Sequence, residues 1–484
     1  MPRVPNPTEI IDHDVLVVGG GPAGLFASLA LLADGADDVL IIDAGPDVDD
    51  RRRASDLRGE VGGGEPDYES GIGGAGLFSD GKLCLSLDVG GKLEASIGPR
   101  HRGELLAQIE GVFRRLVDGE FQMQDVTDAE LRRLDRDAVA NDLRFKYYPV
   151  AHIGTDRCGD VIVELRRILE AAGATIRART ELIDIAVDGE SKIASLRSGG
   201  TVRRVRAKKV VLAMGKVGAG RQASLCRGLG MSTQSLPMYV GVRLETDAKL
   251  LDSLFSATKD PKYSALMADG SKVKTHCASE QGEVIELHYS GLPLAGGHNY
   301  SHAQTERSGF SILWDGFVSD TDGYRAATEI MRAADRLTAG HLLAQRISDY
   351  RSGLSTSTED LAALELSCST AIGGDVRQIL PPGFFAAMDT LLERLEKIAP
   401  GFIGDDAVIY GPAIEWWMER ILVDDHFLSE GISGLAVCGD GSGWSQGIVH
   451  AAATGLLAAE GLVGRTPDIE RWVDRNYAGA LTPG

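Results

Sequence analysis

Residues 14 to 24 read DVLVVGGGPAG, a short apolar run followed by a glycine-rich turn. The β-branched residues of the run are typical of a buried parallel strand. In the G-x-G-x-x-G pattern that follows, Gly19 permits a sharp turn, Gly21 lets a pyrophosphate approach the backbone, and Gly24 lets the next helix pack closely on the strand. The stretch therefore predicts a dinucleotide-binding turn.

The residues after the turn complete a strand–helix–strand unit. An apolar helical stretch ends at Gly35, and a second strand, VLIID, ends at Asp43. The pyrophosphate is expected at the helix N-terminus, where free N–H groups favour anions, and Asp43 is placed to accept hydrogen bonds from a ribose hydroxyl. The contacts expected from this unit are Gly19, Gly21, Pro22, Ala23, Gly24, Asp43 and Ala44.

A second element near the end of the chain indicates which dinucleotide binds. Residues 432–439 form a strand-like run, and Asp440-Gly441-Ser442-Gly443 and a small-residue helix from Gly447 follow it. In flavoproteins such an element places its aspartate on the ribityl chain and aims the helix N-terminus at the flavin ring. We expect FAD, with Asp440 at the ribityl chain and Gly447 and Ile448 at the ring.

Composition and charge exclude several classes of partner. Fifty Lys and Arg against seventy Asp and Glu give a net charge of −20, which disfavours nucleic acid and anionic membrane surfaces. The six cysteines form no C-x-x-C pair, so neither a metal site nor a disulfide framework is expected. No signal peptide or membrane span is evident, and a cytoplasmic location is expected.

The alternation of segments predicts an α/β protein with two parts. A Rossmann-like FAD-binding domain with a parallel sheet is expected from residues 10–100, 150–235 and 430–470, and a helical insertion at 101–149. Residues 236–429 predict an α+β substrate cap with an antiparallel sheet. Helices are expected within it at 324–347 and 388–398. In the FAD domain we expect a helix from near Asp160, a strand over 175–187 and a strand at 210–215.

Four segments carry a resemblance to a known family: GGAGLFSDGKL at 73–83, HIGTD at 152–156, MGKVGAGRQASLCRGLGM at 214–231 and YVGVRLE at 239–245. With the flavin motifs, they resemble the bacterial FAD-dependent dehydrogenases of the glutathione-reductase-like two-dinucleotide flavoprotein superfamily. The resemblance implies that the glycine loop at 73–83 packs against the flavin. The further cofactor contacts expected are Gly74, Ala75, Gly76, Ser79, Gly81, Lys82, Leu182, Ala213 and Gly215.

Two polar residues in these segments keep alternative interpretations. Lys82 stabilises negative charge on the reduced ring, positions an acid substrate, or is a solvated lysine, and His152 either faces the pocket or is structural. Thr155 and Asp156 are expected to cap the following helix. GIGGAG at 71–76 also matches G-x-G-x-x-G, but it lacks the flanking strand and helix of a second nucleotide site.

The cap departs from the family where the substrate is expected. THCASEQGEV at 275–284 stands in place of a cysteine-rich segment, and GPAIEWWMERI at 411–421 in place of an arginine- and serine-rich one. Fold and cofactor carry over from the resemblance, whereas the substrate does not. The candidates for chemistry are His276 and Glu415 as proton acceptors, Arg420 as a carboxylate or oxyanion partner, and Trp416 or Trp417 as walls for a ring-shaped substrate. Lys82 is a further candidate, and so is Trp444, which flanks the element expected to touch the flavin. The alternatives are aromatic core packing and a surface ion pair between Glu415 and Arg420.

Several functions are compatible with these motifs. The first is a dehydrogenase or oxidase that moves a hydride from a small, possibly ring-containing, organic substrate to FAD, with oxygen or a carrier as final acceptor. The alternatives are an NAD(P)H-dependent monooxygenase, a double-bond reductase, and a non-catalytic FAD-binding sensor. No second strand–glycine–helix unit is evident in residues 236–425, which favours the first function and leaves NAD(P)H as an alternative reductant.

Overall fold

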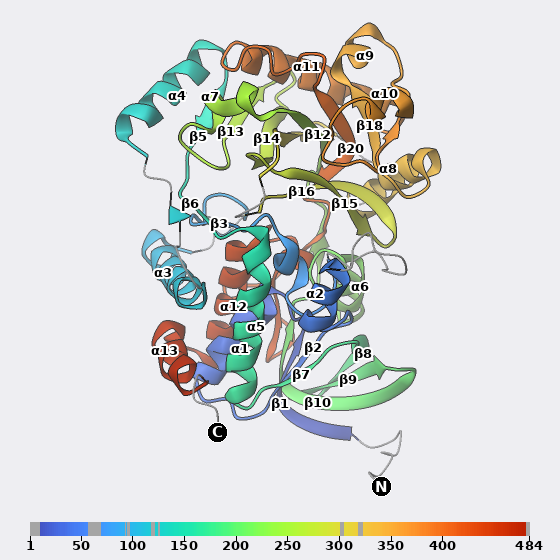
Figure 1. Ribbon diagram of the computed structural model, residues 1–484. Coiled ribbons are helices and arrows are strands. Elements are labelled where there is room, and N and C mark those ends of the chain that lie inside the picture. Colours follow the sequence, from blue (N-terminus) through green and yellow to red (C-terminus); the bar gives the residue numbers. More distant parts are fainter. Residues whose placement is uncertain are drawn as a thin grey trace.

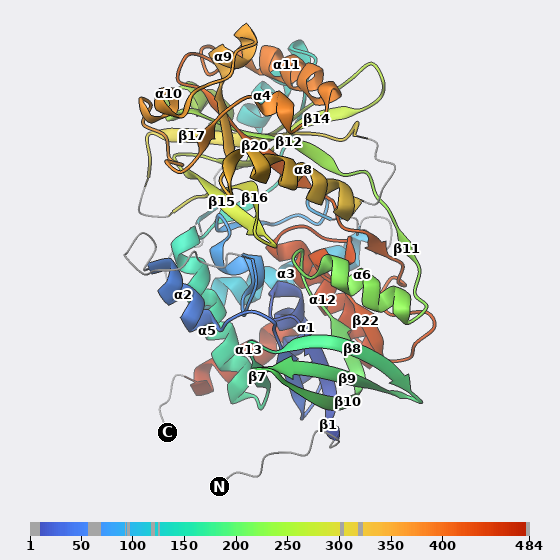
Figure 2. The same ribbon diagram turned by 90° about the vertical axis from the view of Figure 1, so that its right-hand side faces the viewer.

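The computed structural model describes residues 10–56, 69–91, 93, 97–117, 122–123, 126–300, 304–317 and 323–480. Figures 1 and 2 show two tiers, each with its own sheet, and the chain passes between them several times. The tier that carries β1 also holds both ends of the described chain. This tier takes its strands and helices from the start, the middle and the end of the sequence.

The β1 tier is built on a seven-stranded sheet. Its order is β7-β2-β1-β10-β9-β8, and β22 pairs with the end of β10. The pairs that join β7, β2, β1, β10 and β22 are parallel, and those that join β8, β9 and β10 are antiparallel. The strands are β1 (Ile10–Val18), β2 (Val39–Ile42), β7 (Thr175–Arg177), β8 (Glu181–Asp188), β9 (Ser191–Ser198), β10 (Thr201–Leu212) and β22 (Leu435–Val437). This is the expected Rossmann-like α/β arrangement with a parallel sheet.

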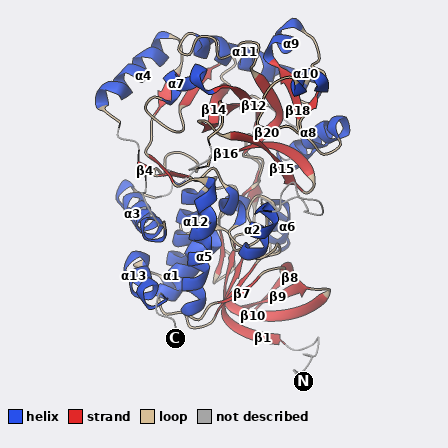
Figure 3. Cartoon of the chain, in the orientation of Figure 1, coloured by secondary structure: helices blue, strands red, loops and turns tan. Residues whose placement is uncertain are grey.

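The central strands of this sheet carry apolar side chains on both faces, and helices pack on the sheet and bury them. Val15 and Val17 of β1 point into one core, which includes helical side chains, while Leu16 and Val18 point into another. In Figure 3, α1, α5 and α12 lie together on one side of the sheet. The helices of this tier are α1 (Pro22–Ala33), α2 (Val48–Asp56), α3 (Pro99–Leu116), α5 (Thr155–Ala171), α6 (Ala219–Gly228), α12 (Ile448–Val463) and α13 (Ile469–Ala480).

The second tier, here called the cap, contains an eight-stranded sheet. In spatial order its strands are β19 (Ile372–Gly373), β18 (Leu343–Arg346), β20 (Val408–Glu415), β12 (Tyr239–Asp247), β17 (Arg307–Trp314), β14 (Lys272–Ser279), β13 (Lys262–Leu266) and β5 (Arg144–Lys146). All but the β18–β19 pair are antiparallel. The cap helices are α4 (Asp128–Ala140), α7 (Asp252–Phe255), α8 (Gly323–Thr338), α9 (Ile347–Ser352), α10 (Thr358–Ala362) and α11 (Pro382–Glu396).

Short strands connect the tiers. The hairpin of β15 (Glu283–Tyr289) and β16 (Leu292–His298) lies on the cap side, and β11 (Thr233–Gln234) pairs with β21 (Arg420–Ile421). A small sheet joins β3 (Lys82–Cys84), β6 (Val150–His152) and β4 (Gln122–Met123). None of the described helices is long and apolar enough to cross a membrane.

Some predicted boundaries were wrong. The helix expected over 324–347 ends at Thr338, because Ala339 and Gly340 adopt positive φ, and residues 343–346 form strand β18 instead. The helix expected from near Asp160 begins at Thr155, so Thr155 and Asp156 lie in its first turn.

Two further stretches differ from their expected structure. The strand expected over 175–187 is split into β7 and β8 around Arg179, which has φ of 49°. The stretch 101–149, expected as helical, contains α3 and α4 but also β4 and β5, and β5 pairs with β13 of the cap sheet.

Candidate active site

A cavity of about 1090 Å³ lies where the two tiers meet. Its lining comes from the glycine turn after β1, the ends of β2 and β10, the start of α12, and the cap strands β12, β14 and β20. Ligand pockets commonly measure roughly 300–1,000 Å³, so this cavity has room for a large cofactor together with a second molecule.

The glycine turn forms one wall of the cavity through close packing of its own backbone. Gly19 has φ of 112°, and a side chain on Gly24 would overlap the carbonyl oxygen of Gly19. Gly21 differs, because a Cβ there would lie 3.7 Å from the nearest atom found, the Cα of Gly74. Gly21 therefore faces the cavity, next to the first turn of α1, and is open to an approaching anion.

Asp43 holds the turn from the end of β2. Its Oδ2 accepts a hydrogen bond from Gly20 N at 2.8 Å, and its Oδ1 accepts one from Gly45 N at 2.9 Å. Burial raises the pKa of Asp43, although these N–H groups and Arg51 oppose the shift. The carboxyl group borders the cavity and is available to a ribose hydroxyl there.

Asp440 marks the other end of the expected cofactor site. It begins a 3₁₀ turn, Asp440–Ser442 (η5), and accepts hydrogen bonds from Ser445 Oγ at 2.7 Å and Gly447 N at 3.3 Å. Burial raises its pKa to about 6. Helix α12 starts immediately after Gly447, so its N-terminus opens into the same cavity as Asp440.

Most of the predicted cofactor contacts border this cavity. They are Gly19, Gly21, Pro22, Ala23, Asp43, Ala44, Gly74, Ala75, Gly76, Ser79, Lys82, Leu182, Ala213, Gly215, Asp440, Gly447 and Ile448. Gly24 and Gly81 do not line it. A side chain on Gly81 would overlap the backbone of Gly154, so the chain crossing requires this glycine.

The predicted catalytic residues separate into two groups. His276, Glu415, Arg420, Lys82 and Trp416 border the cavity, whereas Trp444 does not. Trp444 donates from Nε1 to the Ile421 carbonyl at 2.8 Å and packs edge-on against Phe427. The guanidinium of Arg420 lies 4.4 Å from the centre of the Trp444 ring. Trp444 therefore supports Arg420 from behind the cavity wall.

His276 and Glu415 meet beneath the cap sheet. His276 Nε2 lies 3.7 Å from Glu415 Oε1, and Lys216 Nζ lies 3.2 Å from Glu415 Oε2. Burial is the main reason that the pKa of His276 falls to about 4, with the charge of Lys262 adding to the shift. Burial alone would raise the pKa of Glu415, but the charge of Lys216 and the contact with His276 lower it to about 2. At neutral pH the cluster thus contains a neutral imidazole and an ionised carboxylate.

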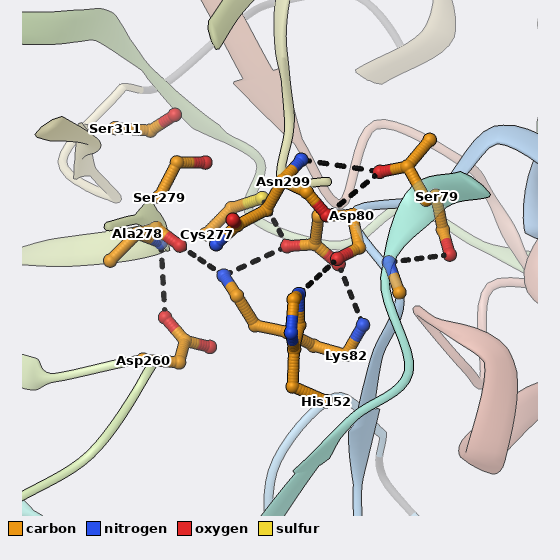
Figure 4. Close-up of polar contacts among 12 residues, drawn as sticks. Ser79, Asp80, Lys82, His152, Asp260, Cys277, Ala278, Ser279, Asn299 and Ser311 are labelled. Atoms are coloured by element: carbon orange, nitrogen blue, oxygen red, sulfur yellow. Dashed lines mark hydrogen bonds and ion pairs between the residues drawn. The ribbon is translucent and has the colours of Figure 1, made fainter. Parts of the chain in front are cut away.

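A second buried cluster surrounds Lys82 (Figure 4). Lys82 Nζ donates to the Ala278 carbonyl and lies 2.9 Å from Asp80 Oδ2. Although burial opposes it, the charges of Asp80 and Asp260 raise the pKa of Lys82. His152 Nε2 contacts the Asp80 carbonyl at 3.1 Å and does not line the cavity. Lys82 is therefore a buried, paired ammonium and not a solvated lysine.

Sequence reasoning missed several charged residues that line the cavity, and Lys216, Asp80 and Arg243 are three of them. A signal was present for each. Lys216 and Asp80 lie within two of the segments that carry the family resemblance, and Arg243 is an arginine inside the apolar strand YVGVRLE. An ionisable residue in a buried strand needs a partner or a ligand, so the position of Arg243 in this strand could have marked it as a candidate site residue.

Comparison with known proteins identifies the chain's family. The family described as FAD dependent oxidoreductase (DAO) matches residues 14–356. This protein is an FAD-dependent oxidoreductase. Its cofactor is FAD, and the open backbone at Gly21, the N-termini of α1 and α12, and the buried carboxyl of Asp440 fit that dinucleotide.

Individual relatives are more distant. An uncharacterized protein of Clostridium beijerinckii is 24% identical over 482 residues, which cover 94% of this chain and 82% of that protein. Among solved structures, glycine oxidase from Geobacillus kaustophilus has a TM-score of 0.39 and 15% identity, covering 94% of this chain and 95% of that one. L-alpha-glycerophosphate oxidase from Mycoplasma pneumoniae has a TM-score of 0.42 and 10% identity, covering 94% and 95%.

Proposed function

We propose that this FAD-dependent oxidoreductase is a dehydrogenase or oxidase that removes a hydride and a proton from a small organic substrate. The observation that carries the proposal is that the cluster of His276, Glu415 and Lys216 borders the same cavity as the glycine turn. FAD, when bound, supplies a hydride acceptor at its N5 atom. The resemblance to the bacterial dehydrogenases of the two-dinucleotide superfamily supports the same function.

The cofactor is held from its two ends. Gly21 and the N-terminus of α1 bind the pyrophosphate, and Asp43 binds a ribose hydroxyl. Asp440 binds the ribityl chain, and the N-terminus of α12 stabilises negative charge at the ring. The glycine loop at 73–76 packs beside the turn, since a Cβ on Gly74 would lie 3.0 Å from the Cα of Gly21.

His276 accepts the substrate proton. Its imidazole is neutral at physiological pH, because burial lowers its pKa to about 4. The Nε2 edge faces Glu415, which leaves Nδ1 as the atom that takes the proton. The carboxylate then stabilises the imidazolium, as the acidic member of a catalytic triad does, and Lys216 keeps that carboxylate ionised.

Aromatic side chains enclose the reacting end of the cavity. Trp416 and Trp417 follow Glu415, and Trp417 packs on Tyr289 at 4.9 Å and on Tyr324 at 6.1 Å between ring centres. Trp416, Trp417 and Tyr289 border the cavity, where they exclude water and offer an apolar surface to a ring-shaped substrate. Arg420 and Lys82 complete the polar lining. The six free cysteines fit a reducing compartment, and we place the protein in the cytoplasm.

The test is to mix the purified, FAD-loaded protein with NADH and with NADPH without oxygen and to record the visible flavin absorption. We expect the colour to persist, and to bleach only when a substrate from a screen of small organic acids, amines and alcohols is added. Rapid bleaching by a nicotinamide would instead favour a monooxygenase or a double-bond reductase. A protein that cannot be loaded with FAD at all would contradict the proposal.

A further inference from the structure

Two residues with left-handed backbone stand directly after the two members of the proposed proton-accepting pair. Cys277, with φ of 45°, follows His276 on β14, and Trp416, with φ of 58°, follows Glu415 at the end of β20. A residue with a side chain rarely adopts positive φ, and it does so where the surrounding structure holds it there. Strain at two matching positions of one site points to a role in that site.

The two kinks change which side chains face the cavity. Successive side chains of a regular strand point to opposite faces of its sheet. Here His276 and Cys277 both border the cavity, and so do Glu415 and Trp416. The register between β14 and β17 shifts between His276 and Ser279, so the first kink is a bulge that re-aims the strand where the pair meets. At that point His276 Nε2 lies 3.7 Å from Glu415 Oε1.

Charged side chains from three other segments hold the kink of β14. Arg243 Nη1, from β12, donates to the Cys277 carbonyl at 2.9 Å. Ala278 donates from its backbone N–H to Asp260 Oδ1 at 3.0 Å, and its carbonyl accepts from Lys82 Nζ of β3 (Figure 4). Arg243, Asp260 and Lys82 are all buried, and they are here called the clamp. Backbone held at three points retains a conformation that a cysteine alone disfavours.

We propose that Cys277 is a positioning residue, whose left-handed backbone, held by the clamp, sets His276 against Glu415 and toward the substrate. This inference rests on the proposed oxidoreductase function and assigns the part of the chain that builds its proton acceptor. Because the clamp bears the strain, the imidazole is in place before a substrate binds. The same arrangement accounts for an arginine, Arg243, within the apolar strand β12.

The test compares two substitutions of Cys277 that differ in backbone preference. Cys277→Gly accepts positive φ freely, whereas Cys277→Val is close in size to cysteine but β-branched, and such a residue almost never adopts positive φ. NMR spectroscopy of the FAD-loaded protein with isotope-labelled histidine measures the pKa of His276, and His276→Gln identifies its signal. The charged groups that act on its imidazole, Glu415, Lys262 and Lys274, are unchanged in both variants.

We expect the pKa of His276 in Cys277→Gly to equal that of the unaltered protein, about 4, since glycine keeps the kink. In Cys277→Val the kink should straighten and the imidazole should leave its buried position, so its pKa rises to about 5–6, nearer its ordinary value. Cys368→Val is the matched control and should leave the pKa of His276 unchanged. Cys368 is buried in the cap, lies outside the cavity and does not have positive φ.

A second pair of variants tests the clamp. Arg243→Met removes the donor to the Cys277 carbonyl and should raise the pKa of His276, as Cys277→Val does. The lost positive charge acts in the same direction, so the double variant Arg243→Met with Cys277→Gly separates the two causes. Glycine keeps the kink without the clamp, and the pKa in the double variant should return most of the way to about 4.

Three results would overturn the inference: Cys277→Val folds without raising the pKa of His276, Cys277→Gly raises it as much as Cys277→Val does, or the double variant behaves like Arg243→Met. If Cys277→Val does not fold, the Arg243 variants decide, and an Arg243→Met protein with an unchanged pKa then contradicts the inference. The visible flavin absorption separates these failures from that of the proposed function. A yellow protein with an unmoved pKa contradicts the role of Cys277, whereas a protein that never binds FAD contradicts the function itself.

Discussion

The glycines of the cofactor turn lack a side chain for different physical reasons. Gly19 and Gly24 are required by the protein's own backbone, since Gly19 has positive φ and a side chain on Gly24 would overlap the Gly19 carbonyl. Gly21 has an ordinary φ of −81° and room for a Cβ within the protein. Its surroundings inside the protein do not demand glycine, whereas an approaching pyrophosphate does.

This difference predicts opposite behaviour of two alanine variants. Gly21→Ala should keep the unfolding free energy of the FAD-free protein within about 0.5 kcal/mol and weaken FAD binding tenfold or more. Gly24→Ala should destabilise even the FAD-free protein, by about 1–3 kcal/mol, because helix α1 must move off the turn. Urea unfolding of the FAD-free proteins and titration with FAD measure the two effects. Unaltered FAD affinity in Gly21→Ala would refute the assignment.

His276 predicts an acid sensitivity of the folded state. Its pKa is about 4 when folded and near 6.5 in an unfolded chain, so between these values the unfolded state binds the proton and stability falls as the pH falls. His276→Gln removes this effect. Between about pH 7 and pH 5 the variant should lose about 1–2 kcal/mol less unfolding free energy than the unaltered protein.

Urea unfolding of the FAD-loaded protein at several pH values measures this difference. His288→Gln is the control, because His288 contacts the Gly340 carbonyl outside the cavity. Identical pH profiles for His276→Gln and the unaltered protein would show that the imidazole is not buried as described.

At the scale of elements, an irregularity in strand β14 supplies backbone carbonyls to two buried cations, Arg243 and Lys82. The register between β14 and β17 shifts between His276 and Ser279, and Cys277 within the shift has φ of 45°. The bulge turns the Cys277 carbonyl toward Arg243 and the Ala278 carbonyl toward Lys82. It thereby links the cap sheet to β3 of the flavin tier.

The Lys82–Asp80 pair at this junction predicts a non-additive stability change. Asp80→Asn removes the nearest counter-charge of a buried ammonium, which then has only the more distant Asp260, and should lower the unfolding free energy by about 3–5 kcal/mol. Adding Lys82→Met should restore most of that loss, since no charge then remains unpaired. Urea unfolding measures both. Glu329→Gln, which breaks the exposed Arg325–Glu329 pair, should change stability by less than about 0.5 kcal/mol. A double variant as unstable as Asp80→Asn would contradict the account.

At the scale of the whole molecule, acidic residues outnumber basic ones and give the chain a net charge of −20. The cavity lining does not share this excess, because Lys262, Lys272 and Lys274 stand there with Asp260 and Asp315. The acidic surface repels itself in the compact state, and dissolved salt screens that repulsion.

Raising sodium chloride from about 0.01 M to 0.5 M should raise the Tm of the FAD-loaded protein by about 2–5 °C, because screening weakens the self-repulsion. Calorimetry at each salt concentration measures this change in Tm. A Tm that falls with salt would show that attractive pairs outweigh the repulsion.

Prediction from sequence succeeded where the signal is local. The strand, glycine turn and helix after β1 are contiguous, as are β22, Asp440 and α12, so spacing alone indicated an α/β protein that binds FAD. It failed at boundaries such as residues 339–346, where an apolar stretch after α8 forms β18. The same apolar residues suit a helix or a strand, and only the neighbouring β20 selects the strand.

The amino-acid sequence by itself determined that the protein is an FAD-dependent oxidoreductase, and it located the residues of the dinucleotide turn, because both depend on residues adjacent in the chain. Only the tertiary structure decided which partners the buried charged side chains contact. Lys216 and Glu415 are 199 positions apart, and Lys82 and Ala278 are 196 apart. Their contacts, and the lack of a carboxylate beside Arg243 among the described residues, follow from strand register and from the packing of the cap on the flavin tier.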